Sequence, residues 1–221
     1  MRKLERPIDP PPCLEELDSE FNQWSDVDKA QIWSYFDPMQ HGFCCYCEKV
    51  AIKGNGHIEH FYHKGKKGKI ATYQKLTFDW NNLFGCCGSE FSDTCGHYKD
   101  SGGKKNGPGL YDPQQIIKPD IDDPTVFFCF TNEGEILVKD TLNEADSFRA
   151  QETIRVLRLD FEPLVDQRKR LIDRVRSEYE LIFNSSNDGA ILEQDLSNLI
   201  ESIKSHEFQT AVLDVYNLSD Q

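Results

Sequence analysis

The apolar and polar positions of the chain fall into three patterns, and the first covers residues 1–39. A proline-rich lead is followed by four apolar residues at helical spacing, which predict a helix. These residues are Leu14, Leu17, Phe21 and Trp24. A second short helix is predicted over residues 26–36, ending before Pro38, because a residue that precedes proline avoids helical geometry. We interpret this stretch as a helical cover whose aromatic side chains pack inward.

The third pattern, over residues 113–221, begins with a predicted hairpin. Residues 125–130 and 136–138 are runs rich in β-forming residues, and the turn sequence between them is typical of two antiparallel strands. Asn143 can then cap a helix that runs toward Leu157.

The rest of this third stretch predicts long helices. One has Asp160 near its cap and Pro163 in its first turn, a position that proline favours. Its apolar residues recur on one face. They are Leu164, Leu171, Ile172, Val175, Tyr179 and Ile182. Another helix is predicted after the break at residues 187–189. We interpret residues 113–221 as a β-hairpin plus a mainly helical scaffold.

The middle stretch, residues 40–112, lacks an apolar pattern long enough for a core of its own. It is rich in glycine, lysine, cysteine and histidine and carries several turn signals. Six of the eight cysteines of the 221-residue chain lie between residues 44 and 95, which is poor spacing for a distributed disulfide framework. A structural metal is the economical way to hold such a segment together.

Charge separates this middle stretch from the rest of the protein. The chain carries a net charge of -13, but residues 40–105 hold ten lysines against six acidic residues, a local charge of +4 that leaves -17 elsewhere. A basic island in an acidic protein can steer nucleic acid to one face. The acidic remainder either keeps the protein soluble or meets a basic partner. No apolar run is long enough for a membrane span, so we expect a cytoplasmic protein with no membrane association.

The cysteine spacing predicts a structural zinc site. Cys44 and Cys47 are separated by two residues, which lets both thiolates reach one ion from a tight turn. We expect Cys87 and Cys95 to complete the site, with the intervening residues forming an excursion. Spacing alone leaves two choices open, because Cys45 can replace Cys44 and Cys86 can replace Cys87.

Between the two cysteine pairs lies Glu59-His60, a pair suited to hydrolysis of phosphodiesters. A neutral imidazole can deprotonate water while a carboxylate-bound divalent ion neutralises charge on phosphate. In most proteins such a pair is a solvated ion pair, but its position between two zinc half-sites favours the catalytic interpretation. We interpret His57 and His63 as ordinary polar residues rather than additional ligands or phosphate contacts.

Together these motifs resemble the HNH endonucleases, the ββα-metal nucleases that often carry a zinc brace. The resemblance rests on the ordered combination of the cysteine pairs with Ile58-Glu59-His60, Asn82-Leu83 and His97-Tyr98-Lys99, about a quarter of the chain. It implies an α+β fold with a zinc-braced ββα-metal (HNH) nuclease core over residues 40–112. The chain departs from the common pattern in carrying Glu at position 59 and Gly between Cys95 and His97.

The resemblance also implies roles for individual residues. His60 would be the general base, and Asn82 would hold the loop that orients it. Glu59 and His97 would bind Mg²⁺ or a similar catalytic divalent cation, and Lys99 would lie near phosphate. Three lysines that follow the pair in sequence can line the path of the substrate backbone, with Lys69 just beyond them. They are Lys64, Lys66 and Lys67.

More narrowly, the motifs and their spacing resemble the HNH nuclease subunit of Septu antiphage systems and of related retron-associated effectors. That resemblance implies a bacterial antiviral defence effector that cleaves DNA and is controlled by a partner ATPase, which would dock on the helical scaffold of residues 113–221. No base-reading element is evident in the sequence, so we expect low sequence specificity. Two other interpretations stay open from the residues alone. One is an RNase or a toxin directed at tRNA, and the other is a non-catalytic zinc-stabilised adaptor.

Overall fold

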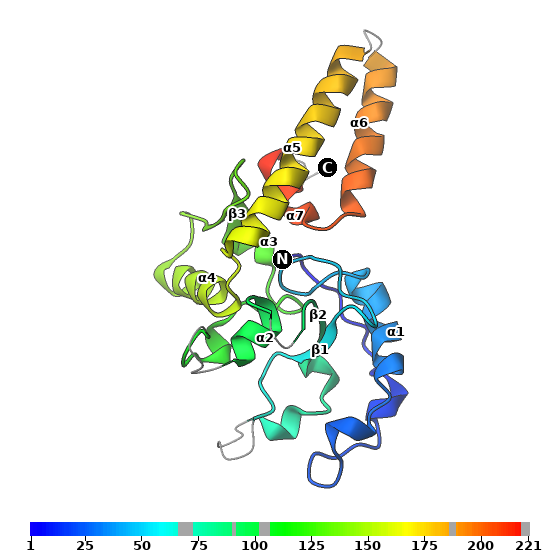
Figure 1. The fold of residues 1–221 in the computed structure, drawn as a ribbon, viewed down its shortest axis with the longest axis vertical. Coiled ribbons are helices and arrows are strands. Elements are labelled where there is room, and N and C mark those ends of the chain that lie inside the picture. The colour runs from blue at the N-terminus through cyan, green and yellow to red at the C-terminus, as the bar shows by residue number, and fades with distance from the viewer. Residues whose placement is uncertain (66–72, 90–91, 102–106, 186–188, 218–221) are drawn as a thin grey trace.

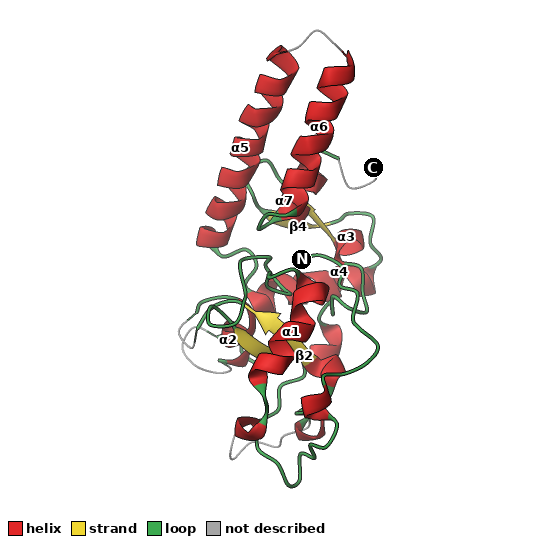
Figure 2. Cartoon of the chain, turned by 90° about the vertical axis from the view of Figure 1, so that its right-hand side faces the viewer, coloured by secondary structure: helices red, strands yellow, loops and turns green. Residues whose placement is uncertain are grey.

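The computed structural model describes residues 1–65, 73–89, 92–101, 107–185 and 189–217. Figure 1 shows a broad body built from the N-terminal and cysteine-rich segments, with two long helices, α5 and α6, projecting from it side by side. Figure 2, turned by 90°, shows the same division, with the small sheet that includes β2 inside the body.

Within the described residues, helices and small antiparallel sheets are mixed. The α-helices are α1 (Lys29–Gln40), α2 (Cys95–Asp100), α3 (Pro124–Phe127), α4 (Glu144–Leu157), α5 (Glu162–Ser185), α6 (Gly189–Lys204) and α7 (Gln209–Val215). The two sheets each contain two strands, β1 (His57–His60) with β2 (Leu83–Cys86) and β3 (Phe128–Phe130) with β4 (Ile136–Val138). Short 3-10 turns lie at Pro12–Leu14, Trp24–Asp26, Gln74–Leu76, Trp80–Asn82 and Pro113–Gln115. The expected mixture of helices and strands is confirmed.

The main apolar core draws on all three stretches of the sequence. It extends from Leu4 through Phe36, Phe84 and Leu157 to Phe208, so the cysteine-rich segment shares a core with its neighbours. A second, smaller core lies between α5, α6 and α7. None of the described helices combines the length and apolar character that a membrane crossing requires.

The helix predicted from Leu14 to Trp24 does not form. Only 3-10 turns occur there, and Phe21 is 83% exposed rather than packed. Asp18 explains the difference, because its side chain accepts a hydrogen bond from the amide of Glu20 and its own amide donates to Asn22 Oδ1. Such local side-chain bonds offer the backbone an alternative to the helix.

The second N-terminal helix is longer than predicted. α1 begins after Asp28, whose carboxylate accepts from the amides of Ala30 and Gln31, and continues through Pro38 to Gln40. Proline in the last turn removes one backbone donor, a cost that the buried side of the helix offsets. Gln40 then pairs with the outer edge of β2, because its side chain both donates to the Gly85 carbonyl and accepts from the Gly85 amide.

The C-terminal predictions agree better with the structure. The hairpin is confirmed, although residues 124–127 form α3 because Asp123 caps a turn that begins with Pro124. Asn143 caps α4 by accepting from the Asp146 amide, and α5 carries Pro163 in its first turn. The helix after residues 187–189 is confirmed as α6, whereas α7 was not predicted.

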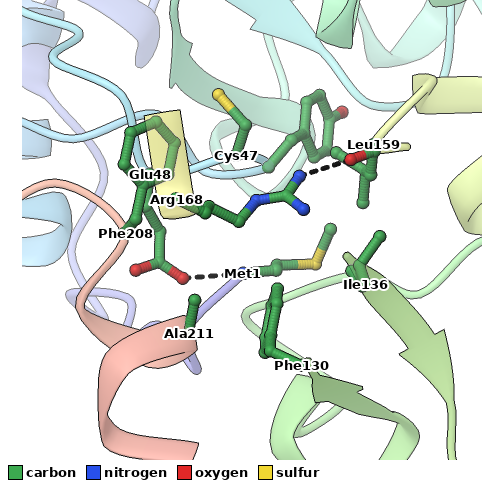
Figure 3. A pocket seen from close by; sticks show the side chains of 10 residues that line it. Met1, Cys47, Glu48, Phe130, Ile136, Leu159, Arg168, Phe208 and Ala211 are labelled. Atoms are coloured by element: carbon green, nitrogen blue, oxygen red, sulfur yellow. Dashed lines mark hydrogen bonds and ion pairs between the residues drawn. The ribbon is translucent and has the colours of Figure 1, made fainter. Parts of the chain in front are cut away.

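The N-terminal segment and α5 clamp the cysteine-rich segment from two sides. Arg6 pairs with Asp120 at 2.6 Å and donates to the carbonyls of Trp80 and Leu83, which fixes the start of β2. On the other side, Arg168 reaches from α5 to the Leu159 carbonyl, and the Met1 amino group lies 2.7 Å from Glu48 (Figure 3). The cavity between them is about 10 Å³, roughly the space for one water molecule, so this junction is packed rather than a ligand site.

Candidate metal centre

Four buried cysteines converge on one point and can hold a metal ion such as zinc. Their sulfur atoms all lie within 4.8 Å of one another, and no other such set of Cys, His, Asp or Glu ligands occurs among the residues that the structure describes. We call them the cysteine group: Cys44, Cys86, Cys87 and Cys95. Zinc in structural sites is bound by four tetrahedral ligands, and four thiolates are a common set. The donor set therefore fits zinc.

Separate elements bring these cysteines together. Cys44 follows α1 in a loop, Cys86 ends β2, Cys87 comes next, and Cys95 is the first residue of α2. Two backbone amides are directed at the sulfurs, with Tyr46 N 3.5 Å from Cys44 Sγ and Gly96 N 3.4 Å from Cys86 Sγ. Such contacts favour thiolates, which are the form that binds metal, against burial and the neighbouring thiols, which raise the pKa of Cys86 well above its usual range.

The group overlaps the predicted ligand set without matching it. Cys44, Cys87 and Cys95 belong to both sets. Cys86 was predicted only as an alternative to Cys87, whereas the structure places both in the cysteine group. Cys47 lies outside the 4.8 Å set, yet its Sγ is 3.4 Å from Cys87 Sγ. Cys45 is also buried, and burial raises the pKa of its thiol well above the usual range. Cys47 and Cys86 are therefore alternatives for the fourth position beside Cys44, Cys87 and Cys95.

Glu59 is buried on β1 and is neutralised from one side. Its Oε1 lies 2.9 Å from Lys99 Nζ and accepts from the Tyr46 hydroxyl at 3.2 Å, while its Oε2 lies 3.5 Å from His57 Nε2. Burial alone would raise the pKa of this carboxyl, but the charges of Lys99 and His57 outweigh burial and lower it to about 2. The carboxylate is therefore ionised, with one oxygen held and the other facing the imidazole.

Lys99 is 1% exposed and lies beneath the site rather than on its surface. Besides Glu59, its Nζ donates to the carbonyls of His60 and Phe61 and to Asp100 Oδ1. Burial opposes the charge, but the two carboxylates raise the pKa of Lys99 well above its usual value. In this arrangement Lys99 ties α2 to the end of β1, so contact with phosphate would require the ammonium to leave these partners.

His60 ends β1 and is 5% exposed. Its Nε2 lies 3.0 Å from the Thr77 carbonyl, and because a carbonyl can only accept, Nε2 carries the proton and Nδ1 is the acceptor. The Trp24 ring packs edge-on against it, with centroids 4.5 Å apart. Burial, reinforced by the charge of Lys64, lowers the pKa of His60 to about 3, so the imidazole is neutral at pH 7.

Asn82 holds the two segments that surround His60. Its Oδ1 accepts from the Tyr62 amide at 2.6 Å, and its Nδ2 donates to the carbonyls of Tyr62 and Leu76. Tyr62 lies just beyond His60, and Leu76 precedes the residue whose carbonyl contacts the imidazole. Asn82 is thus placed as a positioning residue for His60.

His57 lies beside the second oxygen of Glu59, and His97 packs against His57. Their rings pack with centroids 3.9 Å apart. Both ring nitrogens of His57 are buried without a hydrogen bond of normal geometry to the described residues, although Glu59 raises the pKa of His57 against the opposing effect of burial. We call His57, Glu59, His97 and Lys99 the Glu59 cluster. His57 was interpreted as an ordinary polar residue, although its spacing of two from Glu59 on a strand places both on one face.

The predicted phosphate-contacting lysines are only partly within the described residues. Lys64 Nζ lies 4.7 Å from the centroid of the Trp24 ring, and burial lowers the pKa of this lysine. Lys66, Lys67 and Lys69 lie outside the residues that the structure describes. Lys64 is therefore the one of these lysines that can be placed, and it lies close to His60.

Comparisons with known proteins add no family assignment. No protein-family model matches the chain, and no curated protein matches it significantly. The resemblance to HNH endonucleases therefore stays a prediction that depends on the motifs and on the geometry around Glu59 and His60.

Proposed function

We propose that this protein is a metal-dependent endonuclease that hydrolyses phosphodiester bonds, with a ββα-metal core of the HNH type. One observation carries the proposal. Two antiparallel strands and the helix that follows them present the motif residues in order: Glu59 and His60 from β1, Asn82 from the turn directly before β2, and His97 from α2. The cysteine group fastens the beginning of that helix to the end of β2.

His60 supports the proposal because its protonation and orientation suit a general base. Its Nε2 proton is committed to the Thr77 carbonyl, which leaves Nδ1 to take a proton from an attacking water. Its pKa is low in the free protein, but a bound anionic phosphate raises the pKa of a neighbouring imidazole and so strengthens the base. Asn82 fixes the loops on either side of the imidazole.

Glu59 and His97 are the residues that would hold the catalytic divalent cation. Lys99 and Tyr46 fix the carboxylate by one oxygen, and the other remains directed toward the His57 imidazole, against which His97 packs. Such an ion supplies neutralisation of charge on the phosphate and on the departing oxygen. The structural zinc would hold the helix that presents His97.

We further propose DNA as the preferred substrate, in an antiviral defence role under the control of a partner ATPase. The basic island of residues 40–105 supports nucleic-acid binding, and Lys64 lies over the Trp24 ring that packs against His60. Contacts to phosphate carry no base information, so we expect low sequence specificity.

The test compares wild-type protein with His60→Ala on supercoiled plasmid and on total RNA, each with Mg²⁺, with Mn²⁺ and with EDTA. We expect plasmid nicking that EDTA abolishes and that His60→Ala lowers by about 100-fold or more, the usual contribution of a general base. His206→Ala, outside the site, is the matched control. Circular dichroism and zinc content should be unchanged in both variants. Equal cleavage by wild type and His60→Ala, or no cleavage of either nucleic acid by wild type, contradicts the proposal.

A further inference from the structure

We infer that the outer part of the α5–α6 pair docks a partner protein by binding a basic amphipathic helix in the groove between the two helices. We call this part, residues 177–203, the helical arm. The inference rests on the proposed function only in that both involve a partner protein, and it holds whether or not the chain cleaves nucleic acid. It specifies the surface that the partner contacts and the chemistry that the partner presents there.

The helical arm has little core of its own. Figures 1 and 2 show α5 and α6 projecting from the body as a pair, with no other described helix beside their outer ends. Among the described residues of the arm only Leu199 and Ile203 are buried, and both belong to the second core, which α7 shares. An apolar helix face is normally buried against another element. The arm therefore leaves apolar surface that no described part of the chain covers.

A groove of about 400 Å³ lies between the two helices of the arm. Leu181 and Ile182 line it from α5, and Leu199 lines it from α6. Leu181 is 70% exposed, although it is among the most apolar residues of the arm. Ile191 is 52% exposed and lies one turn before Asp195, which also lines the groove, so it extends the same side of α6. Such a groove between two helices can take the apolar face of a third helix.

The charge of the arm determines which kind of helix fits. Residues 177–203 include six acidic residues and no lysine, arginine or histidine. Two of the acidic residues, Glu178 and Asp195, line the groove itself. Arg174, just inside the arm, lies 3.6 Å from Glu178, but both side chains are about half exposed and such pairs are weak.

A surface of one sign attracts a partner of the opposite sign. It repels the phosphates of nucleic acid, and it repels a second copy of the same acidic arm. An apolar stripe flanked by lysine or arginine therefore complements the groove, whereas nucleic acid and self-association do not. Exposed apolar surface of this kind marks an interaction site in many proteins.

The test measures binding of fluorescent peptides to zinc-loaded full-length protein by anisotropy. The probe is a peptide of about 18 residues, about five helical turns, with a leucine stripe on one face and lysines elsewhere. One control peptide has glutamate in place of each lysine, and the other scrambles the probe so that the stripe is lost. We expect the probe to bind at least about 10-fold more tightly than either control, and more weakly as salt is added.

Variants of the arm locate the binding site. Leu181→Ser with Ile191→Ser should weaken binding of the probe by about 10-fold or more, because it removes two apolar contacts. Glu178→Gln with Asp195→Asn should weaken it by about 3-fold or more and reduce its salt dependence. Phe148→Ser, the matched control, removes a half-exposed apolar side chain from α4 and should change neither. Thermal melts and zinc analysis verify that each variant is folded.

Binding and cleavage can fail separately. Equal binding of the probe by wild type and by folded Leu181→Ser with Ile191→Ser, or equal binding of the probe and either control peptide by wild type, overturns the inference. Sedimentation that shows a wild-type dimer lost in the same variant assigns the groove to a second copy and also overturns it. His60→Ala should bind the probe as wild type does. Wild type that binds the probe through the arm but cleaves neither nucleic acid contradicts only the proposed function.

Discussion

The cysteine group and the Glu59 cluster are adjacent and joined by α2, yet their charges are balanced in different ways. The sulfurs of the cysteine group are contacted by other thiols, by backbone amides and by the Thr94 hydroxyl, so no member of the group carries a positive charge that would balance four thiolates. The Glu59 cluster contains its own cation, Lys99, bonded to one carboxylate oxygen. We therefore expect a bound metal ion to stabilise the first group, whereas the second is balanced by its own lysine.

This difference matters because one short helix serves both groups. Cys95 belongs to the cysteine group, Gly96 borders Glu59, and His97 and Lys99 belong to the Glu59 cluster, all within α2 (Cys95–Asp100). A helix of this length is not stable alone. Loss of metal from the cysteine group should thus disturb the Glu59 cluster, while changes in the cluster should leave the zinc in place.

The largest expected effect comes from removing a sulfur that belongs to both the predicted and the observed sets. Cys44→Ser should lose zinc and destabilise the protein by about 4 kcal/mol or more, since loss of a structural metal is among the few changes of that size. For a protein of this length, that corresponds to a fall in Tm of about 10 °C or more. Zinc analysis and thermal melts check the result.

Cys129→Ser is the matched control for this experiment, because Cys129 lies half-buried on β3 outside the cysteine group. It should keep both zinc and Tm. A Cys44→Ser protein that retained full zinc and melted like wild type would show that the cysteine group is not a structural metal site.

A second, smaller effect is expected at the Glu59–Lys99 pair. Both partners are about 98–99% buried, and removing one member of a buried pair costs about 3–5 kcal/mol because the other charge stays unpaired. Lys99→Met and Glu59→Gln should each show such a loss in urea unfolding of zinc-loaded protein. The double variant should be much less unstable than the sum, with a coupling of about 2 kcal/mol or more. Additive losses would mean that the pair is not a unit.

Helices with strong local signals were predictable from sequence, whereas elements set by distant packing were not. Asn143 and Pro163 mark the starts of α4 and α5, and both starts were predicted. The region around Asp18 failed because side-chain bonds to backbone compete with a helix that the apolar spacing favoured. α7 has no cap signal and forms by burying Ala211 and Val212 against other elements.

The candidate site was likewise predictable in part, where residues close in sequence determine it. The cysteine spacing predicted a metal group, because the distance along the chain limits which sulfurs can meet, but the choice among neighbouring cysteines depends on how β2 and the loop after α1 fold. The alternation of side chains along β1 could have placed His57 on the same face of the strand as Glu59. The packing of Trp24 over His60 joins positions far apart in sequence and has no local signal.

The smallest expected effect concerns Cys47 and Cys86. It tests whether the cysteine group has one sulfur more than zinc needs. Cys86 lies inside the 4.8 Å set, and Cys47 Sγ lies 3.4 Å from Cys87 Sγ just outside it. Because zinc takes four ligands, we expect either Cys47→Ser or Cys86→Ser alone to retain about one zinc per chain, with losses of about 1–2 kcal/mol. The double variant should lose the zinc, as Cys44→Ser does. If one single variant lost zinc and the other did not, the first would identify the fourth ligand and the group would hold no spare sulfur.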